Sequence, residues 1–260
     1  MNNKKILAIS QFLIILSVFI ILSACKKKET PVIETGTVAD IDGNIYNTVK
    51  IGDQWWMAEN LKVNRYRNGD SVKYVPQLGY NLDSATWNHL DSGAYCIIDN
   101  LSVTSQNYGG KMFGYLYNWY VVNDPRNIAP EGWHIPSDAE WKVLEEYLGM
   151  SPDDADHMSW RGTNQGNKLK IEGGSKGWNQ PSDIYTVWGT NESRFTALGG
   201  GCCMFNGIWG NPGTFSTGFW WTSSTDNDKP LYRYLDYNKP NIFRYYGPKT
   251  YGFSIRCVKD

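Results

Sequence analysis

The sequence predicts a single α+β domain with short antiparallel strands, one clear helix and long loops. Aromatic residues make up 15% of the 260 residues, with 12 Trp and 17 Tyr beside 26 Gly, and this composition favours strands and turns over long helices. The dipeptide Asp42-Gly43, typical of hairpin turns, lies between two stretches with the residue pattern of strands. A clear helix-start signal occurs at Ser137.

The N-terminal part of the predicted domain is expected to form a hairpin or meander over residues 37–58. Its second strand, 44–51, alternates along its length, so every second side chain shares a face. One of these faces carries Ile45, Asn47, Val49 and Ile51. Gly52-Asp53 predicts a second turn, and a third strand is expected over Gln54–Met57.

The clearest helix is predicted over residues 138–148. Ser137 and Glu140 have the spacing of a capping box, in which each side chain accepts a hydrogen bond from the other residue's backbone N–H. One face of this helix carries Trp141, Leu144 and Leu148. Gly149 is suited to end the helix, because glycine readily adopts the left-handed conformation found there.

Three further segments have weaker signals. A second short helix is expected at Ser151-Pro152, since Pro suits the first helical position. Residues 115–122 are apolar and aromatic, which indicates a buried strand or a short helix, two alternatives that periodicity does not separate at this length. Residues 252–260 predict a closing strand that alternates its side chains between two faces.

The N-terminus has the pattern of a bacterial lipoprotein signal peptide. A short basic start precedes the apolar run Ile6–Ile21, which is short for a membrane span, and small residues then precede Cys25. A cysteine at this position resembles a lipobox, so we expect acylation of Cys25. An uncleaved anchor helix is the alternative. The expected organisation is a signal peptide over 1–24, a tether over 25–36 and a folded domain over 37–260, outside the cytoplasm and anchored to a membrane, with the outer membrane as the expected one.

Composition and motifs exclude several classes of function. The net charge is −1 with no basic block beyond the tether, which argues against a nucleic-acid partner. The histidines His89, His134 and His157 lack metal-ligand spacing, and a hydrogen-bonded structural role is the better interpretation of His134. No nucleophile motif of the serine hydrolases occurs. We therefore expect no metal, no cofactor and no catalytic site.

Four cysteines remain after Cys25: Cys96, Cys202, Cys203 and Cys257. An even number is typical of disulfides in an oxidising compartment. Three pairings are open. The neighbours Cys202 and Cys203 could join only as a strained vicinal disulfide. The favoured prediction is a disulfide between Cys96 and Cys257.

Several stretches, taken in order, resemble the Fibrobacter succinogenes major paralogous domain family. They are residues 40–46, 49–61, 114–119, 130–141, 219–224 and 254–260. Residues 133–141 and the closing strand are also similar to C-type-lectin-like folds, in particular to formylglycine-generating enzymes, which implies a fold of that kind. Members of the family often carry a cysteine where this chain has Ala129. If that cysteine is the usual partner of Cys257, the resemblance implies that Cys257 has lost its partner here or has another.

The aromatic residues of the C-terminal third suggest a ligand-binding surface. The candidates are Trp209, Trp220 and Trp221, because exposed aromatic rings stack on sugars. Neighbours on a strand point to opposite faces, so one residue of the Trp220-Trp221 pair is expected to face outward.

The leading hypothesis is a non-catalytic binding module for glycan or another extracellular polymer. One alternative is a structural or adhesive protein that binds other envelope proteins. A second is an enzyme of the formylglycine-generating type, which requires a reactive thiol at Cys202, Cys203 or Cys257.

Overall fold

The computed structural model describes residues 33–78, 81–82, 84–97, 112–172, 178, 189–204, 207–209 and 216–260. The fold given below is that of the unit formed by residues 34–260. The predicted signal peptide and Cys25 lie outside the described residues. In the part of the chain that is described, no helix has the length and hydropathy needed to cross a membrane.

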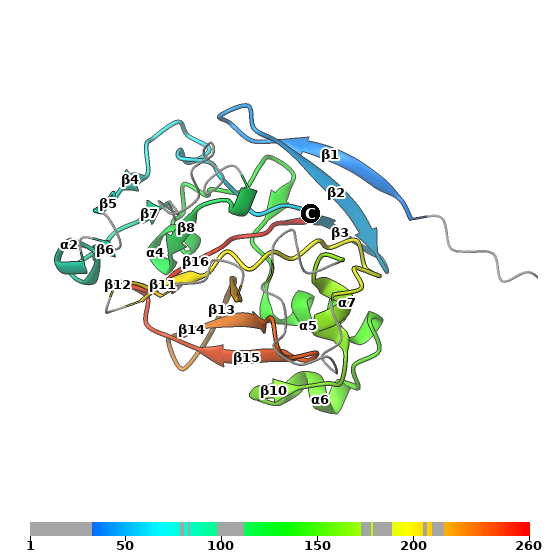
Figure 1. The fold of residues 1–260 in the computed structure, drawn as a ribbon. Coiled ribbons are helices and arrows are strands. Elements are labelled where there is room, and N and C mark those ends of the chain that lie inside the picture. Colours follow the sequence, from blue (N-terminus) through cyan, green and yellow to red (C-terminus); the bar gives the residue numbers. More distant parts are fainter. Residues whose placement is uncertain are drawn as a thin grey trace, which may run out of the picture. The chain divides into compact units, whose positions relative to one another are not determined.

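A five-stranded antiparallel sheet contains the predicted meander (Figure 1). Its strands, in order across the sheet, are β1 (Thr35–Ala39), β2 (Ile45–Ile51), β3 (Gln54–Met57), β17 (Val258–Lys259) and β9 (Trp133–His134). Both predicted turns are confirmed, because β1 pairs with β2 and β2 pairs with β3. Gly52 has a φ of +61° in the second turn, a conformation that glycine adopts without steric cost. Since β1 begins at Thr35, the folded part starts slightly before residue 37.

A six-stranded sheet combines segments from the middle and the end of the chain. Its strands, in order, are β12 (Gly207–Trp209), β11 (Cys202–Met204), β16 (Gly252–Phe253), β8 (Leu116–Asn118), β7 (Ala94–Cys96) and β4 (Lys73–Tyr74). The small hairpin β5 (Gln77–Leu78) and β6 (Asn81–Leu82) and the short helix α2 (Ser84–Asn88) lie between β4 and β7 in the sequence. The segment 115–122 contains both predicted alternatives, since β8 leads directly into helix α4 (Trp119–Val122).

A four-stranded antiparallel sheet carries the candidate functional site. Its strands, in order, are β10 (Ser159–Arg161), β15 (Ile242–Tyr246), β14 (Lys229–Asp236) and β13 (Thr217–Asp226). Helices α5 (Asp138–Tyr147), α6 (Pro152–Asp156) and α7 (Gln165–Leu169) come from the segment around β10. In Figure 1, β14 and β15 run side by side in this sheet.

The capping box and both helix starts predicted from the sequence are confirmed. The Ser137 hydroxyl accepts a hydrogen bond from the Glu140 N–H (3.2 Å), and the Glu140 carboxylate accepts one from the Ser137 N–H (2.7 Å). Helix α5 ends at Tyr147, and Gly149 follows with a φ of +97°. Ser151 caps α6 through the Asp154 N–H.

Two hydrophobic clusters form most of the core. The first cluster includes Tyr46, Leu61, Trp133, Trp221, Phe253 and Ile255. The second cluster includes Val49, Trp56, Trp141, Leu144, Trp220 and Leu235. The apolar face predicted for α5 is confirmed, because its Trp141, Leu144 and Leu148 are all buried in the second cluster. Antiparallel sheets with a few short helices make the fold α+β, as predicted.

Strand β2 contacts both clusters, so the face shared by Ile45, Asn47, Val49 and Ile51 is buried over only part of its length. Val49 and Ile51 are buried in the second cluster, but Ile45 on the same face is 66% exposed. Tyr46, on the opposite face, is buried in the first cluster instead. The strand changes its buried face midway because each half packs against a different core.

The C-terminal segment also differs from the prediction. One closing strand was predicted over residues 252–260, but the structure has two short strands, β16 and β17, and all residues from Gly252 to Val258 are buried. β16 pairs within the six-stranded sheet and β17 within the five-stranded sheet. Figure 1 shows this red segment crossing between other strands. Both of its faces are buried because the segment links two sheets.

Candidate functional site

The four-stranded sheet has two chemically different faces. Side chains alternate between faces along a strand, so β14 places Arg233 and Tyr234 on opposite sides. The register extends this pattern across the sheet, because Arg233 lies opposite Arg244 and Tyr234 lies opposite Phe243. One face therefore presents charged side chains to α5, and the other presents aromatic side chains.

We define the aromatic row as four side chains, one from each strand: Trp160, Phe243, Tyr234 and Phe219. Each residue lies directly opposite the next in the register. The ring centroids of Trp160 and Phe243 are 5.2 Å apart, and those of Tyr234 and Phe219 are 4.4 Å apart with their planes at 9°. Such cross-strand aromatic pairs add stability beyond the area that they bury.

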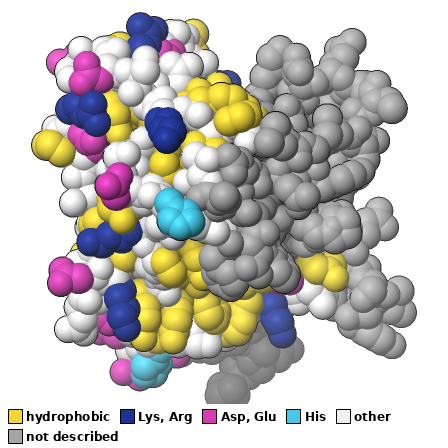
Figure 2. Space-filling view, turned by 90° about the vertical axis from the view of Figure 1, so that its left-hand side faces the viewer, with side chains coloured by type: hydrophobic (Ala, Val, Ile, Leu, Met, Phe, Trp, Pro, Cys, Tyr) yellow, Lys and Arg dark blue, Asp and Glu magenta, His cyan; other side chains and the backbone are white. Residues whose placement is uncertain are grey.

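One end of the row is buried and the remaining residues are partly exposed. Phe219 is 7% exposed and stacks on Phe253 of the core, whereas Tyr234, Phe243 and Trp160 are only partly buried. Tyr245, two residues beyond Phe243 and on the same face, is 38% exposed. Figure 2 shows hydrophobic side chains gathered low on the molecule, at the height of β14 and β15. The row thus connects the core to a surface that a ligand can reach.

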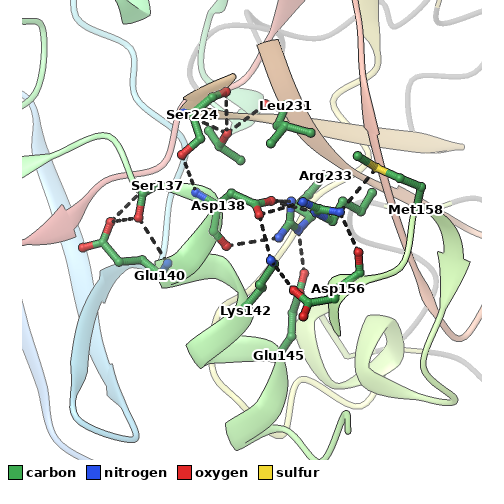
Figure 3. Close-up of polar contacts among 12 residues, drawn as sticks. Ser137, Asp138, Glu140, Lys142, Glu145, Asp156, Met158, Ser224, Leu231 and Arg233 are labelled. Carbon is green, nitrogen blue, oxygen red and sulfur yellow. Dashed lines mark hydrogen bonds and ion pairs between the residues drawn. The ribbon is translucent and has the colours of Figure 1, made fainter. Parts of the chain in front are cut away.

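On the opposite face, Asp138 of α5 joins two arginines of the sheet (Figure 3). Its Oδ1 atom accepts hydrogen bonds from Arg233 Nη1 and Arg244 Nε, both at 2.8 Å, and its Oδ2 atom accepts one from Arg244 Nη2 at 2.8 Å. Burial alone would raise the pKa of Asp138, but the hydrogen bonds and charges of Arg244 and Arg233 hold it well below its usual range. Asp138 is therefore ionised in the folded chain.

Glu145, two helical turns after Asp138, makes a second set of buried ion pairs. Its Oε1 atom accepts from Arg233 Nε and its Oε2 atom from Arg161 Nη2, both at 2.7 Å. Burial lowers the pKa of Arg161 to about 10 despite the nearby Glu145 charge. The hydrogen bonds around Asp138 and Glu145 fix α5 against the back of the sheet that carries the aromatic row.

The two tryptophans predicted to bind ligand are both buried, so this prediction is wrong for Trp220 and Trp221. Trp220 belongs to the second cluster and donates to Asn60 Oδ1 at 2.9 Å. Trp221 belongs to the first cluster and donates to the Tyr117 carbonyl at 2.8 Å. Neither side chain faces outward because this part of β13 lies between the two clusters. Trp209 is on β12, and its side chain lies outside the described residues.

The predicted disulfide between Cys96 and Cys257 is also wrong. Both residues are free, buried thiols, and they belong to different clusters. Cys257 shares the first cluster with Ala129. Burial raises the pKa of the Cys202, Cys203 and Cys257 thiols. Because a reactive thiol requires access and a low pKa, this result counts against the formylglycine-generating alternative.

His134 is hydrogen-bonded, as predicted, between α5 and the end of the chain. Its Nδ1 atom lies 2.6 Å from Asp260 Oδ1 and its Nε2 atom 2.7 Å from Glu140 Oε1. Burial lowers the pKa of His134, but the two carboxylates outweigh burial and raise it above 6.5. Among the residues that the structure describes, no three His, Cys, Asp or Glu side chains gather in a group that could hold a metal ion.

A shallow pocket of about 510 Å³ lies between the loop after β1 and the residues around Ala129. Arg67 lines it and donates to the carbonyls of Ala129 (2.6 Å) and Pro130 (2.5 Å). Asp40 also lines it, and both of its carboxylate oxygens accept hydrogen bonds from neighbouring residues. These polar groups already serve the local structure, so the pocket is a weaker candidate than the aromatic row.

A comparison with models of known protein families shows which family this chain belongs to. Residues 49–259 match the model of the Fibrobacter succinogenes major domain. The chain belongs to the Fibrobacter succinogenes major domain family. The match spans the four-stranded sheet and α5, and so contains the whole aromatic row. Comparison with curated proteins and with solved structures gave no match.

In this member of the Fibrobacter succinogenes major domain family, the sequence itself carries a signal for the aromatic row. Leu231–Leu235 reads Leu-Tyr-Arg-Tyr-Leu, and Ile242–Tyr245 reads Ile-Phe-Arg-Tyr. In both segments arginine alternates with aromatic residues, which predicts two strands with one charged and one aromatic face. The candidates predicted from the sequence were Trp209, Trp220 and Trp221, and they did not include Tyr234, Phe243 or Tyr245.

Proposed function

We propose that this chain is a lipid-anchored surface protein whose domain is a non-catalytic binding module, with the aromatic row as its contact surface for glycan. The observation that carries the proposal is the partly exposed aromatic face of the four-stranded sheet, which ends in Trp160 and Tyr245. Aromatic rings with one accessible face stack on the apolar faces of sugar rings, and exposed aromatic clusters mark binding surfaces.

Polar groups beside the row fit a sugar ligand. The Tyr234 hydroxyl donates to Asp236 Oδ2 at 2.6 Å, so a carboxylate lies beside the aromatic row. The hydroxyls of Tyr245 and Tyr246 lie together, and their rings stack with centroids 4.5 Å apart. Sugar sites combine apolar ring faces with a few polar groups that fix orientation. A C-type-lectin-like relationship of the fold, which the sequence suggests, belongs to the same proposal.

The rigid support behind the row also suits a binding surface. The Arg233 side chain bonds both Asp138 and Glu145 of α5, and its neighbour Tyr234 lies in the row on the other face. A surface held in place by ion pairs from behind loses little conformational entropy when a ligand binds.

A glycan array followed by titration calorimetry tests the proposal. We expect Trp160→Ala and Tyr245→Ala each to weaken binding about tenfold or more, by loss of stacking. Tyr147→Ala is the matched control, because Tyr147 is 63% exposed but lies on α5, outside the row. Absence of binding to every glycan, or equal loss in the Tyr147 variant, would contradict the sugar proposal.

The anchor is tested separately. Labelling with a palmitate analogue in bacterial cells should modify the natural chain, and Cys25→Ser should abolish both the label and membrane association, since acyl chains supply the anchoring energy. A Cys25→Ser chain that still carries the label would contradict the anchor.

The adhesive alternative is supported by a different feature, the sheet edge formed by β1. This strand is the outermost of its sheet, and all of its residues except Val38 are exposed. An exposed edge can accept a further strand from a partner protein. Pull-down from envelope extracts should then recover a partner that is lost in the Thr37→Pro variant, which removes an N–H on the free side of β1, and that is retained in the Trp160→Ala variant.

A further inference from the structure

The sheet register brings Cys96 of β7 and Cys203 of β11 to one face of the six-stranded sheet. Cys96 lies opposite Leu116, Asn118 lies opposite Gly252, and Gly252 lies opposite Cys203. Directly opposed residues share a face, and so do residues two apart on a strand. All of these side chains therefore point to the same side.

The two thiols meet in a small hydrophobic cluster. This third cluster consists of Val75, Trp87, Leu90, Ala94, Cys96, Leu116 and Cys203. Both cysteines are 0% exposed, and the Cys203 thiol hydrogen-bonds the Cys96 thiol. A Cβ atom at Gly252 would lie 2.8 Å from the Trp87 ring and 2.9 Å from the Cβ of Cys203, so a glycine is needed where Trp87 and Cys203 pack over this strand.

We propose that Cys96 and Cys203 form a buried structural disulfide in the mature protein. The competing thiols are placed differently. Cys202 points to the opposite face of β11, where it belongs to the first cluster together with Cys257. This arrangement selects Cys203, rather than its neighbour or Cys257, as the partner of Cys96.

The oxidant for this step is an external disulfide, supplied by a small molecule or by an oxidising protein. One cysteine thiolate attacks the oxidant and expels a first thiol, and the second cysteine then attacks the mixed disulfide and expels a second thiol. Two protein thiols are oxidised to one disulfide, while one oxidant disulfide is reduced to two thiols. Burial raises the pKa of Cys203, so this step occurs while the chain is folding and the cluster is still open.

The crosslink would tie together strands that β8 and β16 separate in the sheet. It would also close the long loop between residues 96 and 203, which contains α5 and β10. In cells the inference rests on the proposed extracytoplasmic location, which supplies the oxidant. The pairing itself is a property of the fold and can be tested without that location.

The first experiment uses the full chain, denatured under reducing conditions and then refolded in detergent in the presence of oxidised and reduced glutathione, so that the thiols are accessible during folding. After denaturation and alkylation, non-reduced peptides are mapped by mass spectrometry. We expect a Cys96–Cys203 crosslink, about 2 Da lighter than the two free peptides together, and a fall of about tenfold in alkylated Cys96. Fragmentation between Cys202 and Cys203 identifies the partner in the natural chain, whether or not a variant folds.

Matched serine variants sharpen the result. Cys203→Ser should abolish the crosslink. Cys202→Ser is the matched control, because it removes the thiol of the neighbouring cysteine, and this variant should retain the crosslink. Cys96 recovered as a free thiol at every glutathione ratio, or joined to Cys202 or Cys257, would overturn the proposal. A crosslink in glutathione that is missing from the chain isolated from cells would support the pairing and contradict the extracytoplasmic location.

Discussion

The two faces of the four-stranded sheet stabilise the same strands by different physics. The face toward α5 holds buried arginines and carboxylates at hydrogen-bond distances of 2.7–2.8 Å, whereas the other face holds the aromatic row. Ion pairs are directional, and the cost of removing charge from water is recovered only when each group is satisfied. Ring stacking tolerates partial exposure. The charged face is therefore closed, while the aromatic face can remain open to a ligand.

Replacement of the two β13 tryptophans tests whether both faces of the sheet are closed at its β13 edge. Trp220 supports the charged side and Trp221 the aromatic side, and both are buried. We expect Trp220→Ala and Trp221→Ala each to lower the free energy of unfolding by ~3–5 kcal/mol, as large core truncations do. Urea denaturation measures this loss. A loss below ~1 kcal/mol for either residue would mean that its side chain faces solvent.

Removal of Arg233 tests the charged face directly. Arg233→Met keeps most of the side-chain volume but leaves Asp138 and Glu145 with fewer cationic partners. We expect the free energy of unfolding to fall by ~3 kcal/mol, because uncompensated charges remain buried. Arg126→Met is the control, since Arg126 pairs with Asp70 and Asp124 near the surface, and its effect should be much smaller. Equal effects of the two variants would remove the contrast between buried and exposed ion pairs.

The pH dependence of stability should distinguish the charged face from the aromatic face, because only the charged face holds the ionised Asp138. The pKa of Asp138 is lower in the folded chain than in the unfolded one, because Arg244 and Arg233 outweigh its burial. Its contribution is therefore fully present above about pH 4, the unfolded pKa, and is lost as pH falls towards the folded pKa. We expect Asp138→Asn to reduce stability at pH 7 and to flatten its decline below pH 4. Urea denaturation over a pH series measures both, and a Trp160→Ala chain should retain the full decline.

The smallest effect on stability is expected at the open end of the aromatic row. Trp160→Ala, at the edge of the sheet, should cost about 1 kcal/mol or less, because its ring is only partly buried. Phe219→Ala, at the buried end, should cost ~3–5 kcal/mol. Thermal unfolding of the two variants compares the ends, and a Trp160 loss as large as that of Phe219 would show that the row is core along its whole length.

Local features were predictable from the sequence because neighbouring residues decide them. The capping box of Ser137 and Glu140, the turn at Gly52 and the start of α6 at Ser151 all depend on residues within a few positions. The hydrogen-bonded role of His134 was also predicted, although its partner Asp260 lies 126 residues away. These features fix the element types of the domain and its α+β class.

The placement of side chains across distant segments was decided only by tertiary structure. Alternation predicts that Trp220 and Trp221 face opposite ways, but the strand alone does not reveal that a core lies on each side of it. Cysteine counts likewise leave three pairings open, and the contact of Cys203 with Cys96 depends on strands separated by two others in the sheet. The sequence by itself determined the turns, the helix caps and the richness in aromatic residues, because these depend on local chemistry and composition. The tertiary structure decided which aromatic face remains open and which thiols meet, because those contacts join residues far apart in the chain.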